Sequence, residues 1–261
     1  MLDGVLIIDK PSGITSHDVV AKVRKALKTK KVGHTGTLDP LATGVLVVCV
    51  EKATKLVNYL TCDEKIYEVE MKLGIKTDTG DITGNIIDED TNYKVTIKEV
   101  NEVIKSFVGK QKQIPPMYSA IKVNGQKLYE LARKGIEIER EPRDIEIFDI
   151  YNIEINNELI KYTVHCSKGT YVRSLCEDIA QRLGTIGTMT NLRRIKSGQF
   201  EIENAIKIDD ISEEKIISME KLFDKGINVQ NNLKELLNGM KIAIQKPDGL
   251  YKLYADRFIG L

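Results

Sequence analysis

The residue best suited to chemistry in this sequence is a single aspartate in a glycine-rich loop. The stretch GHTGTLDPLATG, Gly33–Gly44, places Asp39 directly before Pro40, and the apolar run VLVVCV follows at once. That run predicts a buried strand, which would anchor the loop. A carboxylate held in this way can act as a nucleophile or base. The alternative is a loop aspartate that only caps backbone N–H groups.

Two other motifs compete with this interpretation. The glycines could cradle a phosphate, but the Gly-Lys-Ser/Thr ending of a phosphate loop is absent and Asp39 would repel the anion. The stretch TDTGD, Thr77–Asp81, contains the Asp-Thr-Gly of aspartic proteases, which need two carboxylates that share a proton. It occurs once, so we expect a turn with side-chain hydrogen bonds. A hydrolase that uses Asp78 stays open as an alternative.

Composition places further bounds on the function. Of 261 residues, 42% are apolar and 30% are charged, as in soluble globular proteins. No run reaches the ~18–20 apolar residues of a membrane span, and no basic-then-apolar signal begins the chain, so we expect a cytoplasmic protein. The cysteines form no Cys-x-x-Cys pair and only three histidines accompany them, so we expect no metal site and buried free thiols at Cys49, Cys62, Cys166 and Cys176.

The elements that must position the loop can be predicted from periodicity. GVLIIDK predicts a strand, and Thr15 or Ser16 can cap the helix that follows. IYEVEMKLGI alternates, which places Tyr67 on the core side of a strand. Thr96 and Glu99 form a capping box. Further helices are predicted from about Lys52 and from Lys127 to Gly135, and further strands at DIEIFDI and LIKYTVHCSKG.

One arginine is misplaced by local rules. In GTYVRSLCEDIAQRLG, Thr170 suits a helix N-cap and Gly184 a helix end. Arg173 then falls in the first turn, where the helix dipole disfavours a cation. A carboxylate or phosphate partner would relieve this misfit, and a solvated head group above a packed stem is the alternative.

The net charge of +1 conceals local excesses of basic residues. Residues 1–31 contain seven Lys/Arg against three Asp, and residues 109–143 contain eight against four Glu, an excess of four in each case. Such patches are compatible with nucleic-acid binding, and also with an ordinary solvated surface.

Six blocks in order resemble the bacterial tRNA pseudouridine-55 synthases, the TruB family. They are IDKPSGITSHDVV, GHTGTLDPLATGVLVV, KIYEVEMKLGIKTDTGD, PPMYSAIKVNGQKLYELARKG, SKGTYVRSLCEDIAQRLG and LRRIKSGQF. The resemblance implies isomerisation of the uridine at position 55 in the TψC loop of tRNA, with no cofactor. It implies an α+β fold with a mixed, largely antiparallel sheet flanked by helices, and an active site in a central basic cleft.

The resemblance also assigns residues. Asp39 matches the catalytic aspartate, which could attack the sugar C1′, attack uracil C6 or remove the C2′ proton. Tyr67 matches a residue that lies against the flipped base, and Arg173 the partner of the aspartate. The remaining assignments are the pocket residues Tyr171 and Leu192, His34 as a wedge in the RNA, and Lys10 at the site or its backbone.

The same resemblance divides the chain. Residues 1–227 would form the catalytic domain, and residues 109–143 within it would be an RNA-gripping insertion. Residues 228–261 resemble a partial, truncated PUA domain, a small RNA-binding β-barrel. We therefore expect a tRNA partner, no protein partner, no membrane and a monomer. An RNA-binding protein or tRNA-folding chaperone of the same fold is the alternative.

Overall fold

A computed structural model describes residues 2–61, 64–123, 125–247, 249, 251–256 and 258–260. Cys62, one of the predicted free thiols, lies outside them. The other three cysteines are buried and free, as predicted. No helix in the described ranges is long and apolar enough to cross a membrane.

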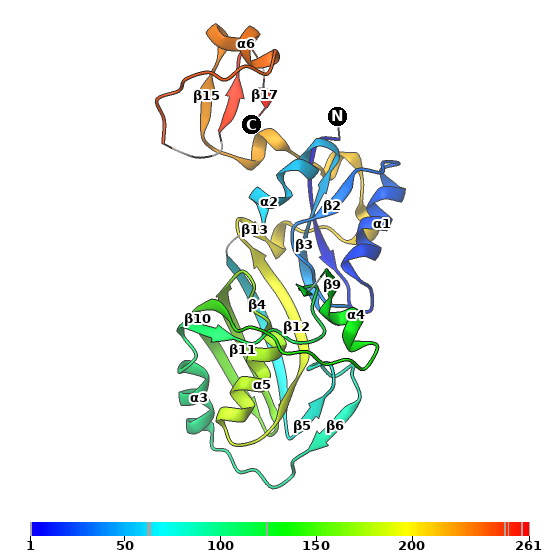
Figure 1. Cartoon of the computed structure of the whole chain (residues 1–261), viewed down its shortest axis with the longest axis vertical. Coiled ribbons are helices and arrows are strands. Elements are labelled where there is room, and N and C mark those ends of the chain that lie inside the picture. Colours follow the sequence, from blue (N-terminus) through cyan, green and yellow to red (C-terminus); the bar gives the residue numbers. More distant parts are fainter. Residues whose placement is uncertain are drawn as a thin grey trace.

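A ten-stranded sheet runs through the body of the molecule (Figure 1). Its order is β14-β1-β3-β12-β4-β11-β10-β7, with β2 paired to β3 and β13 to β12. In the described chain, β3 and β12 are its parallel neighbours and its other pairs are antiparallel. The predicted mixed, largely antiparallel sheet is confirmed. The strands are β1 (Gly4–Lys10), β2 (Val32–His34), β3 (Thr43–Val50), β4 (Glu64–Leu73), β7 (Gly109–Gln113), β10 (Arg143–Asn156), β11 (Leu159–Ser167), β12 (Gly187–Ser197), β13 (Phe200–Glu201) and β14 (Ile217–Ser218).

The N-terminal half of the sheet is covered on both faces, which explains its continuous apolar strands. In β3, Leu46 and Val48 join the main core, whereas Val47 and Cys49 face a second cluster on the other side. The second cluster is closed by the 3-10 helix η1 (Glu51–Leu56) and helix α2 (Val57–Leu60). The single helix expected from about Lys52 is thus two short pieces. A strand buried on both faces has no polar side, so its sequence does not alternate.

The other half of the sheet is covered on one face. Tyr67 and the residues at every second position after it in β4 are buried, while Glu68 on the opposite face is exposed. This is the predicted alternation. Helices α3 (Ile97–Lys105) and α5 (Val172–Arg182) pack on the covered face of this half and contribute to the main core. Helix α1 (Ser16–Ala26) contributes to the same core beside β2 and β3 in the other half (Figure 1).

The helices begin largely where their caps predict. Thr15 caps α1 in a capping box with Asp18, and Thr96 caps α3 in the predicted box with Glu99. Helix α5 differs by one residue, because its N-cap is Tyr171 and not Thr170. Tyr171 makes no capping bond with its own side chain, so other residues must hold this helix end.

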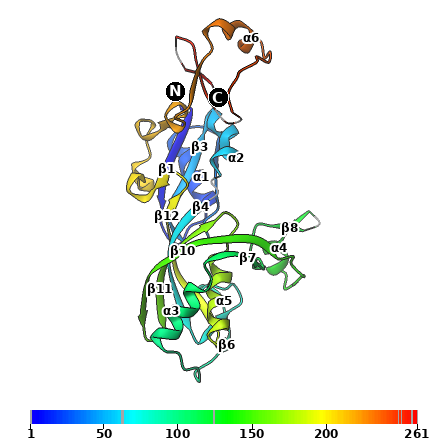
Figure 2. The same cartoon turned by 90° about the vertical axis from the view of Figure 1, so that its left-hand side faces the viewer.

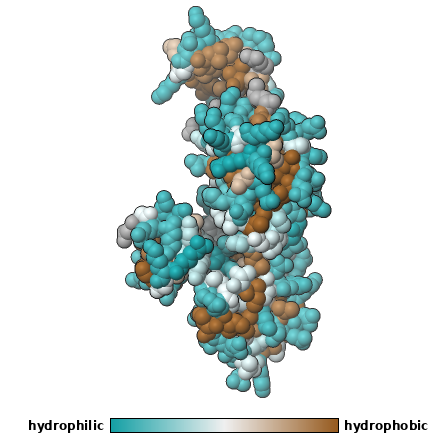
Figure 3. Space-filling view, turned by 90° about the vertical axis from the view of Figure 1, so that its right-hand side faces the viewer, coloured by the Kyte–Doolittle hydropathy of each residue, from teal (hydrophilic) through white to brown (hydrophobic). Residues whose placement is uncertain are grey.

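Two additions extend from the body. A hairpin of β5 (Ile75–Thr77) and β6 (Ile86–Glu89) follows β4. The first residues of the predicted insertion form β7 in the main sheet, and the part between β7 and β10 projects sideways as a separate lobe (Figures 2 and 3). It contains β8 (Lys122–Val123), β9 (Gln126–Lys127) and α4 (Leu128–Ala132), the last within the helix predicted from Lys127.

The end of the chain forms a separate small unit at one end of the molecule (Figure 1). Short 3-10 helices lead to it over the sheet: η2 (Ile202–Asn204), η3 (Ile208–Asp210), η4 (Glu213–Lys215) and η5 (Met219–Leu222). The unit has a three-stranded sheet, β15-β16-β17. Its elements are β15 (Gly226–Asn228), η6 (Gln230–Asn232), α6 (Leu233–Leu237), β16 (Lys252–Tyr254) and β17 (Phe258–Gly260).

Candidate active site

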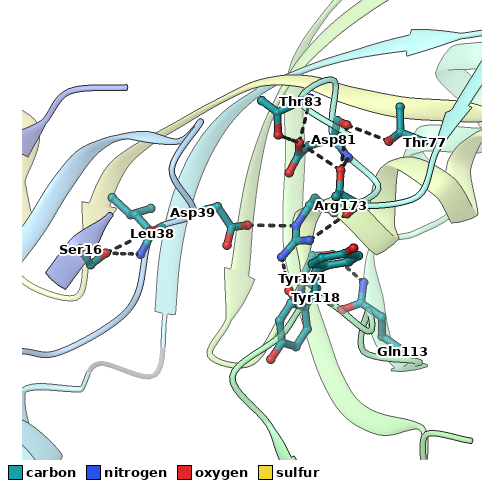
Figure 4. A network of polar contacts seen from close by, with 11 residues as sticks. Ser16, Leu38, Asp39, Thr77, Asp81, Thr83, Gln113, Tyr118, Tyr171 and Arg173 are labelled. Carbon is teal, nitrogen blue, oxygen red and sulfur yellow. Dashed lines mark hydrogen bonds and ion pairs between the residues drawn. The ribbon is translucent and has the colours of Figure 1, made fainter. Parts of the chain in front are cut away.

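The loop that carries Asp39 is fastened through its backbone on both sides of the aspartate. The buried Ser16, in the first turn of α1, accepts a hydrogen bond from the N–H of Leu38 at 2.9 Å and donates to its carbonyl oxygen at 3.0 Å. The N–H of Gly13 donates to the carbonyl oxygen of Pro40. The aspartate therefore lies between two fixed backbone positions, of which Figure 4 shows the one at Leu38.

Lys10 lies beneath the same loop. Its side chain is 0% exposed, and its ammonium group donates to the carbonyl oxygens of Ala42 at 2.6 Å, Pro11 at 2.9 Å and Pro40 at 3.3 Å. Burial lowers the pKa of Lys10 to about 8, while the nearby Asp39 opposes this shift. The sequence assigned Lys10 to the site or its backbone, and the structure places its ammonium on the backbone of the loop.

Asp39 and Arg173 form an ion pair at the centre of the site. The Nε atom of Arg173 lies 3.0 Å from Oδ2 of Asp39, and the side chains are 6% and 33% exposed, respectively. The pair joins the loop between β2 and β3 to the first turn of α5 (Figure 4). The misfit of a cation at this helix start thus has the anionic partner that it required.

The remaining nitrogens of Arg173 bind backbone carbonyl groups. Nη1 donates to the carbonyl oxygen of Thr79 at 2.9 Å, and Nη2 donates to that of Tyr118 at 2.8 Å. The first acceptor comes from the β5–β6 hairpin and the second from the insertion. Because Nε, Nη1 and Nη2 each have a partner, the plane of the guanidinium is fixed. The fixed guanidinium orients the carboxylate that it contacts.

The start of α5 is held by the base of the insertion. The side chain of Gln113 donates to the carbonyl oxygen of Tyr171 at 3.0 Å and accepts from its N–H at 2.8 Å. The hydroxyl of Ser174 donates to the carbonyl oxygen of Ile114 at 3.1 Å. These contacts replace the missing cap and place Tyr171 beside Arg173 (Figure 4). Burial raises the pKa of the Tyr171 phenol, which stays neutral.

Tyr67 and Leu192 lie on the covered face of the sheet. Leu192 pairs with Val69 across β12 and β4, so it shares a face with Tyr67 two residues away. Tyr67 is 7% exposed and Leu192 is also buried. Burial raises the pKa of the Tyr67 phenol, and the charge of Asp39 adds a smaller effect in the same direction. Tyr67 therefore lies within electrostatic reach of the carboxylate.

His34 lies at the end of β2, beside a second histidine. Its ring meets His17 edge to face, with ring centroids 5.7 Å apart. Burial lowers the pKa of His34, and the charges of His17 and Arg194 lower it further. His34 is therefore a neutral ring at pH 7, which suits contact with bases better than contact with phosphate.

Several residues of this arrangement were not singled out from the sequence. The buried Asp81 accepts hydrogen bonds from Thr83 and Thr79 in the hairpin that faces Arg173 (Figure 4). Gln113 and the carbonyl of Tyr118 were also missed. A buried glutamine or aspartate beside a predicted strand end is a weak signal, and a backbone carbonyl has no sequence signal at all.

The competing motif at Asp78 is a turn, as expected. Its carboxylate accepts hydrogen bonds from the backbone N–H of Asn85 at 2.9 Å and from its side-chain amide at 3.1 Å, which closes the β5–β6 hairpin. Within the described residues, no three His, Cys, Asp or Glu side chains gather as a metal site would require.

Comparisons with known proteins place this geometry in a family. A model described as TruB family pseudouridylate synthase (N terminal domain) matches residues 24–172, and a tRNA pseudouridylate synthase B C-terminal domain matches residues 173–245. Proteins named tRNA pseudouridine synthase B are similar to the chain over its whole length. The protein from Clostridium perfringens (strain 13) is 48% identical with 94% of its length covered, and that from Clostridium tetani is 46% identical with 95% covered.

Solved structures agree with this placement. A Cbf5-Nop10-Gar1 complex contains a chain that matches with a TM-score of 0.73 at 28% identity, over 99% of this chain and 77% of that one. An H/ACA RNP bound to a substrate RNA containing 2'-deoxyuridine matches with a TM-score of 0.71 at 26% identity, with the same coverage.

Proposed function

The chain belongs to the TruB family of pseudouridylate synthases, isomerases that act on RNA uridine, and we propose that its substrate is the uridine at position 55 in the TψC loop of tRNA. The names of its relatives, tRNA pseudouridine synthase B, support tRNA as the substrate class. The motif resemblance supports the position within tRNA.

The observation that carries this proposal is the Asp39–Arg173 pair at 3.0 Å. The carboxylate is one-third exposed while the guanidinium beneath it is nearly buried, so the acid can meet an incoming nucleotide in a fixed orientation. Asp39 is the catalytic carboxylate. During the reaction the bond between uracil N1 and C1′ breaks, the base turns, and C5 bonds to C1′. C5 then loses its proton and N1 gains one, so the product is an isomer of the substrate.

The target base must leave its stack before this bond can be reached. Unstacking a nucleotide costs a few kcal/mol, and stacking on an aromatic ring returns about 1–3 kcal/mol. Tyr67 lies against the flipped base, and Tyr171 and Leu192 line the same pocket. His34 fills the space that the base has left. Lys10 acts beneath the loop through its backbone carbonyls, where it keeps Asp39 in place.

The rest of the chain binds the tRNA body. Residues 1–227 are the catalytic domain, and the insertion at residues 109–143 grips the RNA through phosphate contacts. Residues 228–261 are a PUA-like unit. The protein works as a monomer in the cytoplasm, without metal or other cofactor.

The test is to map pseudouridine with a base-specific chemical probe after incubation of an unmodified tRNA transcript with purified protein alone. We expect one modified uridine, at position 55. A matched transcript with cytidine at that position should stay unmodified. Modification elsewhere would refute the proposed substrate, and binding without any product would favour an RNA-binding protein or folding chaperone.

A further inference from the structure

Arg194 is a buried cation apart from the ion pair of Asp39 and Arg173. It lies in β12 and is 2% exposed. In the described part of the chain its guanidinium binds backbone carbonyl oxygens rather than a carboxylate. A buried charge without an ionic partner is costly, and an apolar side chain of similar volume would avoid that cost. Stability alone therefore gives no reason for an arginine at this place.

Its position is the seam between the two halves of the sheet. Arg194 pairs with Gly44 across the parallel β3 and with Tyr67 across the antiparallel β4. The approach to Gly44 is so close that a Cβ atom there would lie 2.2 Å from the carbonyl oxygen of Arg194. Arg194 thus adjoins both the loop of Asp39 and the strand of Tyr67.

The contacts of its side chain tie both ends of the loop to this strand. Nε donates to the carbonyl oxygen of Val45 at 2.7 Å, and Nη2 donates to that of Gly36 at 3.2 Å. Val45 and Gly36 flank the loop of Asp39 on either side. One planar group therefore fixes both ends of the loop from the strand position that lies directly opposite Tyr67.

We propose that Arg194 is a positioning residue for the reaction, which places Asp39 relative to Tyr67 by binding Gly36 and Val45 at the two ends of the loop from a position opposite Tyr67 in the sheet. This inference rests on the proposed function. Lys10 cannot replace it, because its ammonium is engaged by other carbonyl groups of the loop. A lysine at position 194 would keep the charge but would lose the fork that reaches both acceptors.

The test compares Arg194→Lys with Arg193→Lys. Arg193 is the neighbour on the opposite face of β12, where it forms a two-pronged ion pair with Asp9 across the same seam. Single-turnover pseudouridine formation and tRNA binding are measured below the unfolding temperature of each variant. We expect Arg194→Lys to lower the single-turnover rate about 100-fold, as for a misplaced catalytic group. Its dissociation constant for tRNA should stay within about threefold of the wild-type value. Arg193→Lys should retain the wild-type rate.

Arg194→Met supplies a second measurement, because it removes both hydrogen bonds to the loop and replaces the arginine with an apolar side chain. It should lower the rate at least as far as Arg194→Lys, with tRNA still bound. An unchanged rate in folded Arg194→Lys or Arg194→Met, or equal losses in the two arginine-to-lysine variants, would overturn this inference alone. A wild-type protein that forms no pseudouridine would overturn the proposed function as well.

Discussion

Arg173 and Asp39 meet at 3.0 Å, although the arginine starts a helix late in the chain and the aspartate lies in an early loop. Each is held independently of the other. The loop is fastened by Ser16 and Lys10, and the guanidinium by two carbonyl groups from separate segments. The ion pair is therefore the meeting point of two rigid supports, and the orientation of the carboxylate depends on both.

Arg173→Lys tests the guanidinium that is held by the carbonyl groups of Thr79 and Tyr118. Lysine retains the charge but cannot reach Asp39, Thr79 and Tyr118 together. We expect the single-turnover rate to fall about 100-fold or more, with tRNA affinity within a few-fold of wild type. Arg182→Lys, at the other end of the same helix, is the control. A wild-type rate in Arg173→Lys would mean that charge near Asp39 suffices without orientation.

Ser16→Ala tests the attachment of the loop that carries Asp39, and Thr15→Ala provides the comparison. Loss of the buried hydroxyl leaves two backbone groups of Leu38 without partners, which should lower the free energy of unfolding by about 1–3 kcal/mol and also slow catalysis. Thr15→Ala removes only the cap of α1, so it should lower stability by about 1 kcal/mol with an unchanged rate. Urea unfolding and single-turnover assays measure both. Equal rates in the two variants would contradict a role for Ser16 in placing Asp39.

Lys10 should leave a signature in the pH dependence of stability. Its pKa is lowered from 10.5 to about 8, so in that window the unfolded chain holds a proton that the folded chain has lost. Stability from this group therefore rises with pH, by up to about 1.4 kcal/mol per pH unit. The unfolding free energy of wild type minus that of Lys10→Met should be flat below pH 7 and rise above pH 8. A difference that stays constant to pH 10 would contradict the shift.

The insertion should contribute to the salt dependence of tRNA binding. Lys122 and Lys134 are exposed on it, and each phosphate contact that is lost should reduce the slope of log affinity against log salt by about 0.7–0.9. The double variant Lys122→Gln with Lys134→Gln tests this. The control replaces the exposed Lys94 and Lys98, on the side of α3. Equal slopes in the two double variants would remove the insertion from the tRNA interface.

Much of the fold could be predicted because local signals agreed with it. The alternation of β4 placed Tyr67 on the covered face, and the expected cap at Thr15 or Ser16 and the capping box at Thr96 marked two helix starts correctly. The cap at Thr170 failed by one residue, because Gln113 from a distant strand holds the backbone of Tyr171. A tertiary contact of this kind leaves no trace in the local sequence.

In the candidate site too, the residues that a local sequence signal marks could be predicted, and those that only a tertiary contact defines could not. Arg173 could be marked from the sequence because a cation at a helix start is a local conflict that needs an anion. Arg194 could not, because nothing in LRRIKSGQF distinguishes a buried arginine from the exposed side of a strand. Its environment is created by the parallel pairing of β3 and β12, which joins segments about 150 residues apart.

We expect Asp39 to perform the chemistry, and single-turnover pseudouridine formation in tRNA by Asp39→Asn measures this without intermediate steps. Asp78→Asn, a carboxylate of the hairpin turn, is the matched control. We predict no detectable product from Asp39→Asn, with tRNA still bound, and a wild-type rate from Asp78→Asn. Product formation by Asp39→Asn at the wild-type rate would remove Asp39 from the mechanism.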